Sequence, residues 1–519
     1  MHGQLFNTDY LKRGILDTPA WRNFDPAQLA AFTAKLTQLV GTAHQAHNAK
    51  SQGTLNEAQT ESELIEPLLA ELGWADCLMP QVNLSDRGRE DVPDYLLFPD
   101  PEAKATALGK PDAQRAAHGI ALLEGKRYGR ELDRAEATPS AANKKPRDFG
   151  TPSSQMLRYL SRVDVMSDRA VKWGVLTNGA VWRLYWQDAR SRTEQFFEID
   201  LALALQLPGT QPALPDPDAL PPAHQIQLFY VLFHRAAFLP QSWDIQRRSL
   251  HAIALSEARL YEEQVSASLG QRVFNDVFPN LALALARRDT AAQTDAQGFY
   301  TPEYLDEVRD ATLILLYRLL FVFYAEDRRL LPIVDPRYTP YSLSVLRDEI
   351  AAQRDAGHNF PTASSQGWRV LEDIFTMISQ GDDEVGMPAY NGGLFERGRN
   401  AILMRSRIRD ADLAPALDAL SRRTDDVLKA RINYRDLSVA HLGSIYERLL
   451  EYALVQEDIT TPELLARNAD LERRRYPTLP TSVLVARPAS FARKVSGSYY
   501  THDDLVQLVL DKSVGVLIA

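Results

Sequence analysis

Hydrophobic positions in the first part of the chain alternate between helical and strand spacing. Between residues 61 and 72, apolar side chains recur along one helical face, and Glu61 occupies the N-terminal end of that stripe. Short apolar runs within 92–98 and 119–123 predict buried strands. The segment 173–185 carries an Asn-Gly step between apolar runs, a strong hairpin signal. These patterns predict an α/β domain.

The pattern changes after a proline-rich segment. From Pro208 to Pro222, six of fifteen residues are proline, which is typical of an extended, semi-rigid spacer. Beyond it, long amphipathic helical patterns dominate, and the apolar stretch 313–324 is too short to span a bilayer. The predicted organisation is an α/β domain over residues 1–206, a proline-rich linker over 207–225, a mainly helical domain over 226–490 and a further segment over 491–519.

Charged side chains end the apolar run 119–123. Glu124 and Lys126 are two residues apart, so in a strand they project from the same face. Burying this pair is costly unless something is bound there. Asp94 and Glu124 supply the oxygen ligands that Mg²⁺ prefers, and Lys126 could orient or deprotonate an attacking water. A cation at such a site acts as a Lewis acid on phosphate and lowers the pKa of its water. Without this context, a Glu–Lys pair is usually a solvated strand face.

Two helical segments carry further candidates for the same site. Glu61 is expected to be a third acidic group, although a carboxylate favoured by the helix dipole is an equally plausible interpretation. Gln155 and Tyr159 lie one helical turn apart, on the same face of a predicted helix.

The order of these motifs resembles the PD-(D/E)XK nuclease domain, in the version found in type I and type IIG restriction enzymes. The motifs are a helix with Glu and Leu-Gly-Trp, a Pro-Asp-Tyr strand, a Glu-x-Lys strand, a Gln-x-x-x-Tyr helix and a Leu-Thr-Asn-Gly hairpin. The resemblance implies a mixed sheet flanked by helices, in which Asp94 and Glu124 ligate Mg²⁺ and Lys126 supports the nucleophilic water. It also implies that Gln155 lies beside the scissile phosphate, with Glu61 in support. The segment 99–118 departs from the family and is expected to form a surface loop or hairpin extension.

Charge and composition limit the possible partners. The net charge is -10, so any DNA contact requires a local basic patch. Between Lys126 and Arg162, nine Lys or Arg residues face four acids. A solvated loop is the alternative for the basic stretch 144–147. The single cysteine, Cys77, excludes a disulfide framework and a cysteine zinc site. The residues expected to contact DNA are Arg127, Arg130, Lys144, Lys145, Arg147 and Arg158.

The end of the chain carries a second resemblance. Gly-Ser-Tyr-Tyr-Thr at 497–501 is similar to the Gly-x-Tyr-Tyr-Thr-Pro segment that opens N6-adenine DNA methyltransferase domains, with His502 in place of the usual proline. The likeness implies that 491–519 begins such a domain. A helix capped by Thr501 is the local alternative. The cofactor and catalytic loops of that family do not follow, so this portion alone is not expected to methylate. Either a longer natural chain or a separate subunit would supply them. The implied S-adenosylmethionine contacts are Gly497, Tyr499, Tyr500 and Thr501.

Three phrases in the helical domain are similar to the connector that joins nuclease and methyltransferase in single-chain restriction-modification enzymes. They surround Glu326, Gly393 and Glu447, and no chemistry is assigned to them because each is also explained as fold architecture.

The predicted function is that of a Mg²⁺-dependent, type II site-specific endonuclease that hydrolyses phosphodiester bonds of unmethylated double-stranded DNA. It would act within a type IIG-like restriction-modification or phage-defence enzyme, with a transient dimer on DNA expected by analogy. The alternative is the non-cleaving front half of a defence adenine methyltransferase, in which the nuclease fold serves DNA binding or scaffolding. A purely structural protein is a third possibility. Neither a signal peptide nor a membrane-spanning run is apparent in the sequence, which favours a cytoplasmic location.

Overall fold

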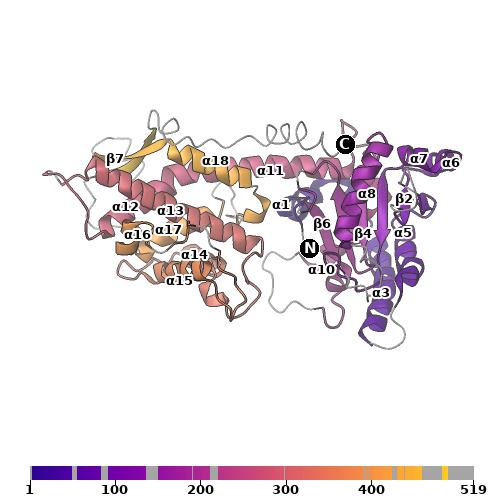
Figure 1. The fold of residues 1–519 in the computed structure, drawn as a ribbon, viewed down its shortest axis with the longest axis horizontal. Coiled ribbons are helices and arrows are strands. Elements are labelled where there is room, and N and C mark those ends of the chain that lie inside the picture. Colours follow the sequence, from indigo (N-terminus) through magenta and orange to yellow (C-terminus); the bar gives the residue numbers. More distant parts are fainter. Residues whose placement is uncertain are drawn as a thin grey trace, which may run out of the picture. The chain divides into compact units, whose positions relative to one another are not determined.

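The chain forms two compact units, Met1–Tyr261 and Glu262–Ala519 (Figure 1). The helix α11 (Leu250–Arg272) contributes residues to both units. The computed structural model describes residues 3–49, 55–82, 84, 92–135, 150–189, 191–193, 195–210, 220–296, 298–390, 393–396, 398–423, 429, 431–437, 439–458 and 482–488.

A six-stranded mixed sheet forms the centre of the first unit. Its strand order follows the sequence from β1 to β6. The pair β3–β4 is parallel, and every other neighbouring pair is antiparallel. The helix α8 (Pro152–Met166) lies between β3 and β4 in the chain and so supplies the crossover that a parallel pair requires. The strands are β1 (Leu78–Pro80), β2 (Tyr95–Leu97), β3 (Ala121–Gly125), β4 (Trp173–Thr177), β5 (Val181–Trp186) and β6 (Phe196–Asp200).

The predicted hairpin is the pair β4–β5. Its turn depends on Asn178, whose Oδ1 accepts hydrogen bonds from the backbone N–H groups of Ala180 (3.0 Å) and Val181 (2.7 Å). Gly179 has a φ of +84°, and a Cβ atom there would lie 2.4 Å from Leu64 Cδ2. The Asn-Gly step is therefore required both by the turn and by the packing of the neighbouring helical segment.

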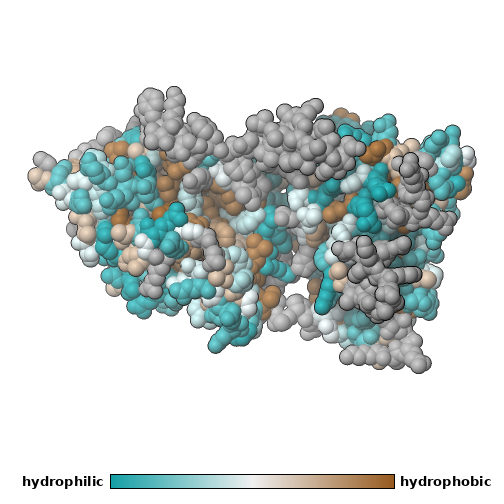
Figure 2. All heavy atoms as spheres, viewed as in Figure 1, coloured by the Kyte–Doolittle hydropathy of each residue, from teal (hydrophilic) through white to brown (hydrophobic). Residues whose placement is uncertain are grey.

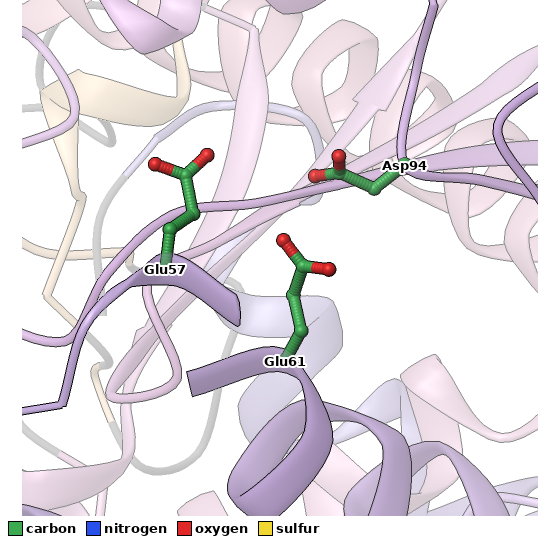
Figure 3. A group of neighbouring side chains, drawn as sticks. All are labelled: Glu57, Glu61 and Asp94. Atoms are coloured by element: carbon green, nitrogen blue, oxygen red, sulfur yellow. The ribbon is translucent and has the colours of Figure 1, made fainter. Parts of the chain in front are cut away.

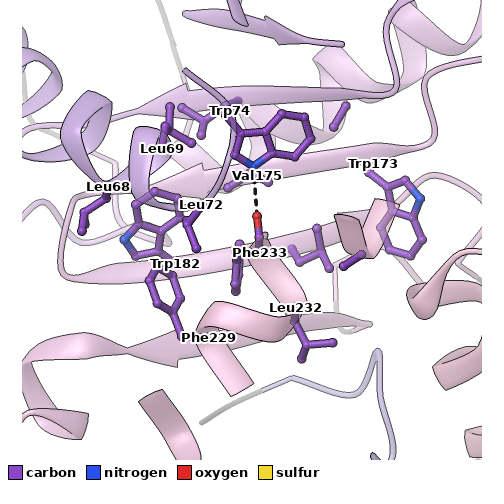
Figure 4. Packing of buried hydrophobic residues seen from close by; sticks show 14 of the residues in the cluster. Leu68, Leu69, Leu72, Trp74, Trp173, Val175, Trp182, Phe229, Leu232 and Phe233 are labelled. Atoms are coloured by element: carbon purple, nitrogen blue, oxygen red, sulfur yellow. Dashed lines mark hydrogen bonds between the residues drawn. The ribbon is translucent and has the colours of Figure 1, made fainter. Parts of the chain in front are cut away.

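Helices from both sides of the proline-rich segment complete the core of the first unit. The indole N–H of Trp74 donates to the carbonyl of Phe233 at 3.0 Å (Figure 4). Phe229 and Phe233, both in α10 (Pro222–Phe233), pack edge-on against Trp182 of the sheet. The predicted start of the helical domain at residue 226 is therefore wrong, because the apolar face of α10 and the first turns of α11 bury against the sheet. Part of the proposed linker, 211–219, lies outside the described residues.

The segment between the two proposed metal strands is helical, which corrects the expected loop or hairpin extension. Asp100 caps α6 by accepting a hydrogen bond from Ala103 N–H at 2.8 Å, and proline follows it at the first helical position. The helical elements of the first unit are α1 (Thr8–Lys12), η1 (Gly14–Asp17), α2 (Pro19–Arg22), α3 (Pro26–Asn48), α4 (Glu57–Thr60), η2 (Glu61–Ile65), α5 (Glu66–Glu71), α6 (Pro101–Leu108), α7 (Asp112–Arg115), η3 (Ala116–His118), α8, α9 (Leu201–Ala204), α10, η4 (Arg235–Phe238) and the start of α11.

The second unit is mainly helical, as predicted, but it also contains an antiparallel strand pair, β7 (Tyr452–Asp458) and β8 (Ser482–Pro488). Hydrophilic residues cover much of its described surface on the face drawn in Figure 2. Among the described residues of the whole chain, no helix has the length and apolar character needed to cross a membrane. The remaining helical elements are η5 (Val273–Val277), α12 (Phe278–Arg288), α13 (Pro302–Asp327), η6 (Thr339–Tyr341), α14 (Leu343–Asp355), α15 (Gln366–Gln380), α16 (Ala401–Arg405), α17 (Asp410–Ser421), η7 (Tyr434–Asp436) and α18 (Val439–Leu450).

The sequence motif around Glu326 has a structural role. The Glu326 carboxylate is fully buried and accepts hydrogen bonds from Tyr338 O–H (2.9 Å), Leu343 N–H (2.8 Å) and Ser344 N–H (2.6 Å). It therefore ties the end of α13 to the N-terminus of α14, where backbone N–H groups have no partner within the helix. Of the other two connector phrases, Asn391, Gly392 and the side chain of Tyr446 lie outside the described residues.

Candidate active site

The adjoining ends of β2 and β3 bring Asp94 and Glu124 together. Tyr95 at the start of β2 pairs with Leu123 of β3, so Asp94 lies opposite the end of β3. The backbone N–H of Gly125 donates to Asp94 Oδ2 at 2.7 Å, and the backbone N–H of Asp94 donates to Glu124 Oε2 at 3.3 Å. Glu124 is only 2% exposed, although it is a carboxylate. The two strands thus hold both proposed Mg²⁺ ligands beside each other.

Lys126 lies on the same side of the sheet as Glu124. Its Nζ is 2.6 Å from Glu124 Oε1 and 3.1 Å from Glu57 Oε1. Its backbone N–H donates to the carbonyl of Thr177 in β4 at 2.8 Å, which continues the parallel β3–β4 pairing beyond Gly125. The sheet therefore fixes the backbone position of Lys126, and this position places its ammonium between the carboxylates of Glu124 and Glu57.

The helical segment contributes two carboxylates. Glu57, Glu61 and Asp94 each offer an oxygen, and these oxygens lie within 4.8 Å of one another; Figure 3 shows the three groups pointing toward one another. Glu61 begins a π-helical turn, η2, between α4 and α5. Such turns re-aim side chains and are frequent at functional sites. A Cβ atom on Gly125 would lie 3.3 Å from Glu61 Cγ, so glycine permits this close approach.

Glu57 is the residue that the sequence reasoning missed. It precedes Glu61 by four residues and therefore lies on the same helical face, which is the signal that could have identified it. It occupies the first turn of α4, where a capping box between Asn56 and Gln59 fixes the start of the helix. Thr60 at the end of this turn accepts a hydrogen bond from Tyr128 N–H at 3.1 Å. This hydrogen bond connects the helical turn that carries Glu57 to the segment that follows β3.

The helix α8 places Gln155 and Tyr159 near the same site. Gln155 Nε2 donates to Tyr159 Oη at 2.7 Å, and Tyr159 O–H donates to the carbonyl of Val92 at 3.4 Å. Val92 precedes Asp94 by two residues. Burial raises the pKa of Tyr159 to about 12, and the negative charge of Glu124 adds to this increase. The charge of Glu124 therefore acts on the Tyr159 hydroxyl, and the hydrogen bond to this hydroxyl orients the Gln155 amide.

The electrostatics of the site favour a bound cation. Burial, followed by the charges of Asp94 and Glu57, raises the pKa of Glu61 to about 7. Burial and Asp94 raise the pKa of Glu124 to about 8, and burial also raises the pKa of Asp94. Lys126 alone does not neutralise four carboxylates. The oxygens of Glu57, Glu61 and Asp94 fit a divalent cation, which would relieve their mutual repulsion. The predicted ligand Glu124 is not in this group of oxygens, because its carboxylate accepts hydrogen bonds from Lys126 Nζ and from the Asp94 N–H.

Lys126 itself is held in the charged form. Burial lowers the pKa of its ammonium, but the surrounding carboxylates of Glu124, Glu57 and Asp94 outweigh burial and raise the pKa above the ordinary lysine value. In this arrangement Lys126 is a hydrogen-bond donor and a positive charge. It is not poised to remove a proton from water, which disfavours the deprotonating role considered from the sequence.

These pKa shifts predict how stability depends on pH. The folded-state pKa values of Glu61 and Glu124 lie above the unfolded value near 4.5, so the folded chain holds protons that the unfolded chain releases. Their contribution to stability is fully present below pH 4.5 and is lost as the pH rises through about 7 and about 8. In EDTA, the thermal midpoint of the first unit is expected to fall from about pH 4.5 to about pH 8 and to level off above that, and Mg²⁺ should restore it most at the higher pH.

The control for this prediction is a carboxylate outside the site. Glu124→Gln should flatten the fall in thermal midpoint and weaken its reversal by Mg²⁺, whereas the exposed Glu63, changed to Gln, should leave both unchanged. Equal behaviour of the two variants would contradict the assigned electrostatics.

The proposed DNA-contacting residues are only partly described. Arg127 and Arg158 are exposed and Arg130 is half-buried. The Arg158 guanidinium lies 5.8 Å from the ring centre of Tyr159, on the helix that carries Gln155. The other candidates, Lys144, Lys145 and Arg147, lie outside the described residues, as do the proposed S-adenosylmethionine contacts Gly497, Tyr499, Tyr500 and Thr501.

Comparison with known proteins leaves the geometry as the basis for assigning a function. No family model, no curated protein and no solved structure matches the chain.

Proposed function

We propose that the first unit is a Mg²⁺-dependent DNA endonuclease of the PD-(D/E)XK type. The observation that carries this proposal is the convergence of Asp94, Glu124 and Lys126 at the adjoining ends of β2 and β3, with Glu61 facing them from the helical segment. The order of elements gives further support. A helical segment with Glu61, the strands β2 and β3, the helix α8 with Gln155 and the hairpin β4–β5 occur in the order of the motifs that carry the resemblance.

Each residue has a role that follows from its surroundings. Asp94 and Glu124 would hold the cation, with Glu61 and Glu57 as additional oxygen donors beside it. A bound Mg²⁺ supplies Lewis-acid polarisation of the scissile phosphate and makes water more acidic. Lys126, charged and hydrogen-bonded to Glu124, would orient the attacking water and stabilise negative charge that develops on the phosphate. Gln155, oriented by Tyr159, would contact the phosphate or that water.

The wider context is proposed on the same resemblance. The first unit would cleave double-stranded DNA within a type IIG-like restriction-modification or phage-defence enzyme, and the helical second unit would connect it to a methyltransferase. S-adenosylmethionine would bind in a longer chain or a partner chain that continues the motif at 497–501.

Plasmid cleavage tests the proposal. The full chain is incubated with supercoiled DNA from several sources, with and without S-adenosylmethionine, in Mg²⁺ or in EDTA. Nicking or linearisation in Mg²⁺ that EDTA prevents is the expected result. Absence of cleavage under all these conditions, together with metal-independent DNA binding, would instead favour a nuclease fold that serves only for DNA binding or scaffolding.

Gln155 is expected to have a moderate effect on cleavage. Gln155→Ala removes an amide that Tyr159 orients, without removing charge from the site, so the rate in Mg²⁺ should fall about 10- to 100-fold. Ser161→Ala on the same helix is the control and should leave the rate unchanged, because the hydrogen-bond partners of Ser161 in the described part of the chain are Leu157 and Arg192. Equal rates for Gln155→Ala and the unmodified chain would show that Gln155 has no role in cleavage. Single-turnover cleavage of a labelled duplex measures both.

A further inference from the structure

A cavity of about 790 Å³ in the second unit is strongly basic. It is formed by the C-terminal end of α12, the segment that leads into α15 and the segment that follows α16. Among the residues that the structure describes, Asp289 is the one acidic residue that lines it. The local charge is opposite in sign to the net charge of the chain, which is -10. The arginines that line the cavity are Arg287, Arg288, Arg369, Arg405, Arg407 and Arg409.

The carboxylate of Asp289 already has hydrogen-bond partners. Both oxygens of Asp289 pair with Arg405, at 2.8 and 2.9 Å, and Tyr304 O–H donates to the same carboxylate at 3.1 Å. These contacts hold the pKa of Asp289 below its usual value, chiefly through the hydrogen bond from Arg405. The lining carries five arginines more than it has carboxylates. One of them, Arg407, lies 3.8 Å from Glu372, which is outside the lining. The remaining excess of positive charge favours a bound anion.

Two polar atoms of lining residues support an anionic ligand. Ser365 Oγ and Arg409 Nε are buried and make no hydrogen bond within the described parts of the chain. Buried donors normally have a partner, and phosphate oxygens would provide one. The first N–H groups of α15 do not contribute, since Asp410 already accepts hydrogen bonds from Gln366 and Gly367.

The chemistry of the lining distinguishes a phosphodiester backbone from a nucleotide. None of the described residues that line the cavity has an aromatic or large aliphatic side chain, so these residues offer a base no apolar surface to stack on. Small-molecule sites, by contrast, are lined mainly by apolar groups. Arginine pairs with phosphate through its planar fork of donors, and duplex DNA presents phosphates at high density.

We propose that this arginine cavity binds the phosphate backbone of duplex DNA. The inference rests on the proposed function in one respect, because DNA is the substrate assigned to the first unit. It places a DNA contact in the helical unit, where sequence reasoning assigned no chemistry, and it predicts that this contact is independent of base sequence.

Fluorescence anisotropy of a labelled duplex of roughly 30 base pairs tests the proposal, with the full chain in EDTA so that no cleavage occurs. Arg287→Gln/Arg288→Gln is expected to weaken binding about 10-fold and to reduce the slope of log affinity against log salt by about 2. The matched control is Arg309→Gln/Arg337→Gln, which removes two arginines of the same unit that pair with Asp306, Asp310 and Asp335 outside the cavity. Its affinity should change less than about twofold. Thermal unfolding confirms that both double variants fold.

Several results would overturn the inference. One is an unchanged salt slope in Arg287→Gln/Arg288→Gln, and another is the absence of DNA binding by the unmodified chain. A third is calorimetric binding of ADP that this variant loses while DNA binding is unaffected. The nuclease proposal fails separately. If DNA binding depends on these arginines but no Mg²⁺-dependent cleavage occurs, the proposed DNA contact stands and the nuclease proposal fails. If the chain cleaves DNA but its DNA binding does not depend on the arginines, the nuclease proposal stands and the proposed DNA contact fails.

Discussion

Replacing Glu124 with Gln, or Lys126 with Ala, is expected to lower Mg²⁺-dependent DNA cleavage by about 10³-fold or more. Glu124 is buried, and its carboxylate accepts hydrogen bonds from the backbone N–H of Asp94 and from Lys126 Nζ, at 2.6 Å, so each change removes one charge from a tightly connected group. Because the residues act together, the double variant should be little worse than either single variant. Initial rates of plasmid nicking measure this directly.

Matched controls separate chemistry from folding. Glu63→Gln changes an exposed carboxylate on the helical segment that carries Glu61, and Lys110→Ala changes an exposed lysine of the first unit. Both should cleave at the unmodified rate. Far-ultraviolet circular dichroism and thermal unfolding of all four variants should show folded proteins. Full activity in Glu124→Gln or Lys126→Ala would mean that the site at β2 and β3 is not catalytic.

The largest effect on stability is expected at Glu326. Glu326→Ala leaves the Tyr338 hydroxyl and the N–H groups of Leu343 and Ser344 without their acceptor inside the second unit. The expected loss is about 3 kcal/mol in the free energy of unfolding of this unit. Glu326→Gln keeps one carbonyl acceptor and should lose about 1–2 kcal/mol.

Hydrogen–deuterium exchange locates this effect. Peptides that cover the end of α13 and the start of α14 should exchange faster in Glu326→Ala, while peptides of the first-unit sheet should not change. Glu349→Ala, an exposed residue of α14, is the control. If Glu326→Ala matched Glu349→Ala in urea midpoint and in exchange, the buried carboxylate would not be what connects α13 and α14.

The sequence was informative where apolar runs end in charged residues. Asp94 directly precedes β2 and Glu124 is the next-to-last residue of β3, and both strands are buried throughout. Their positions could therefore be predicted from the apolar runs that form these strands. The Asn178 hairpin followed from the conformational demands of its turn. Glu57 was missed because it lies in a polar helical turn where no apolar pattern distinguishes it from a solvated residue.

Longer-range features could not be predicted. The helix α6 has no marked apolar face, so its existence depends on the Asp100 cap more than on periodicity. The helix α10 follows a proline-rich segment that looks like a domain boundary, yet its Phe229 and Phe233 bury against Trp182 of the sheet. The arginine cavity is assembled from three separate segments, and only the folded chain places their charges together.

Metal binding is the decisive property of the proposed site. We expect titration with Mn²⁺, followed by electron paramagnetic resonance, to show an ion that Mg²⁺ displaces from the unmodified chain and from Glu63→Gln. Asp94→Asn should weaken this binding at least about 10-fold, because the change removes a charge from the carboxylates that converge there. Unchanged Mn²⁺ affinity in Asp94→Asn would show that Asp94, Glu61 and Glu124 do not form a metal site, and the proposed nuclease would lose its physical basis.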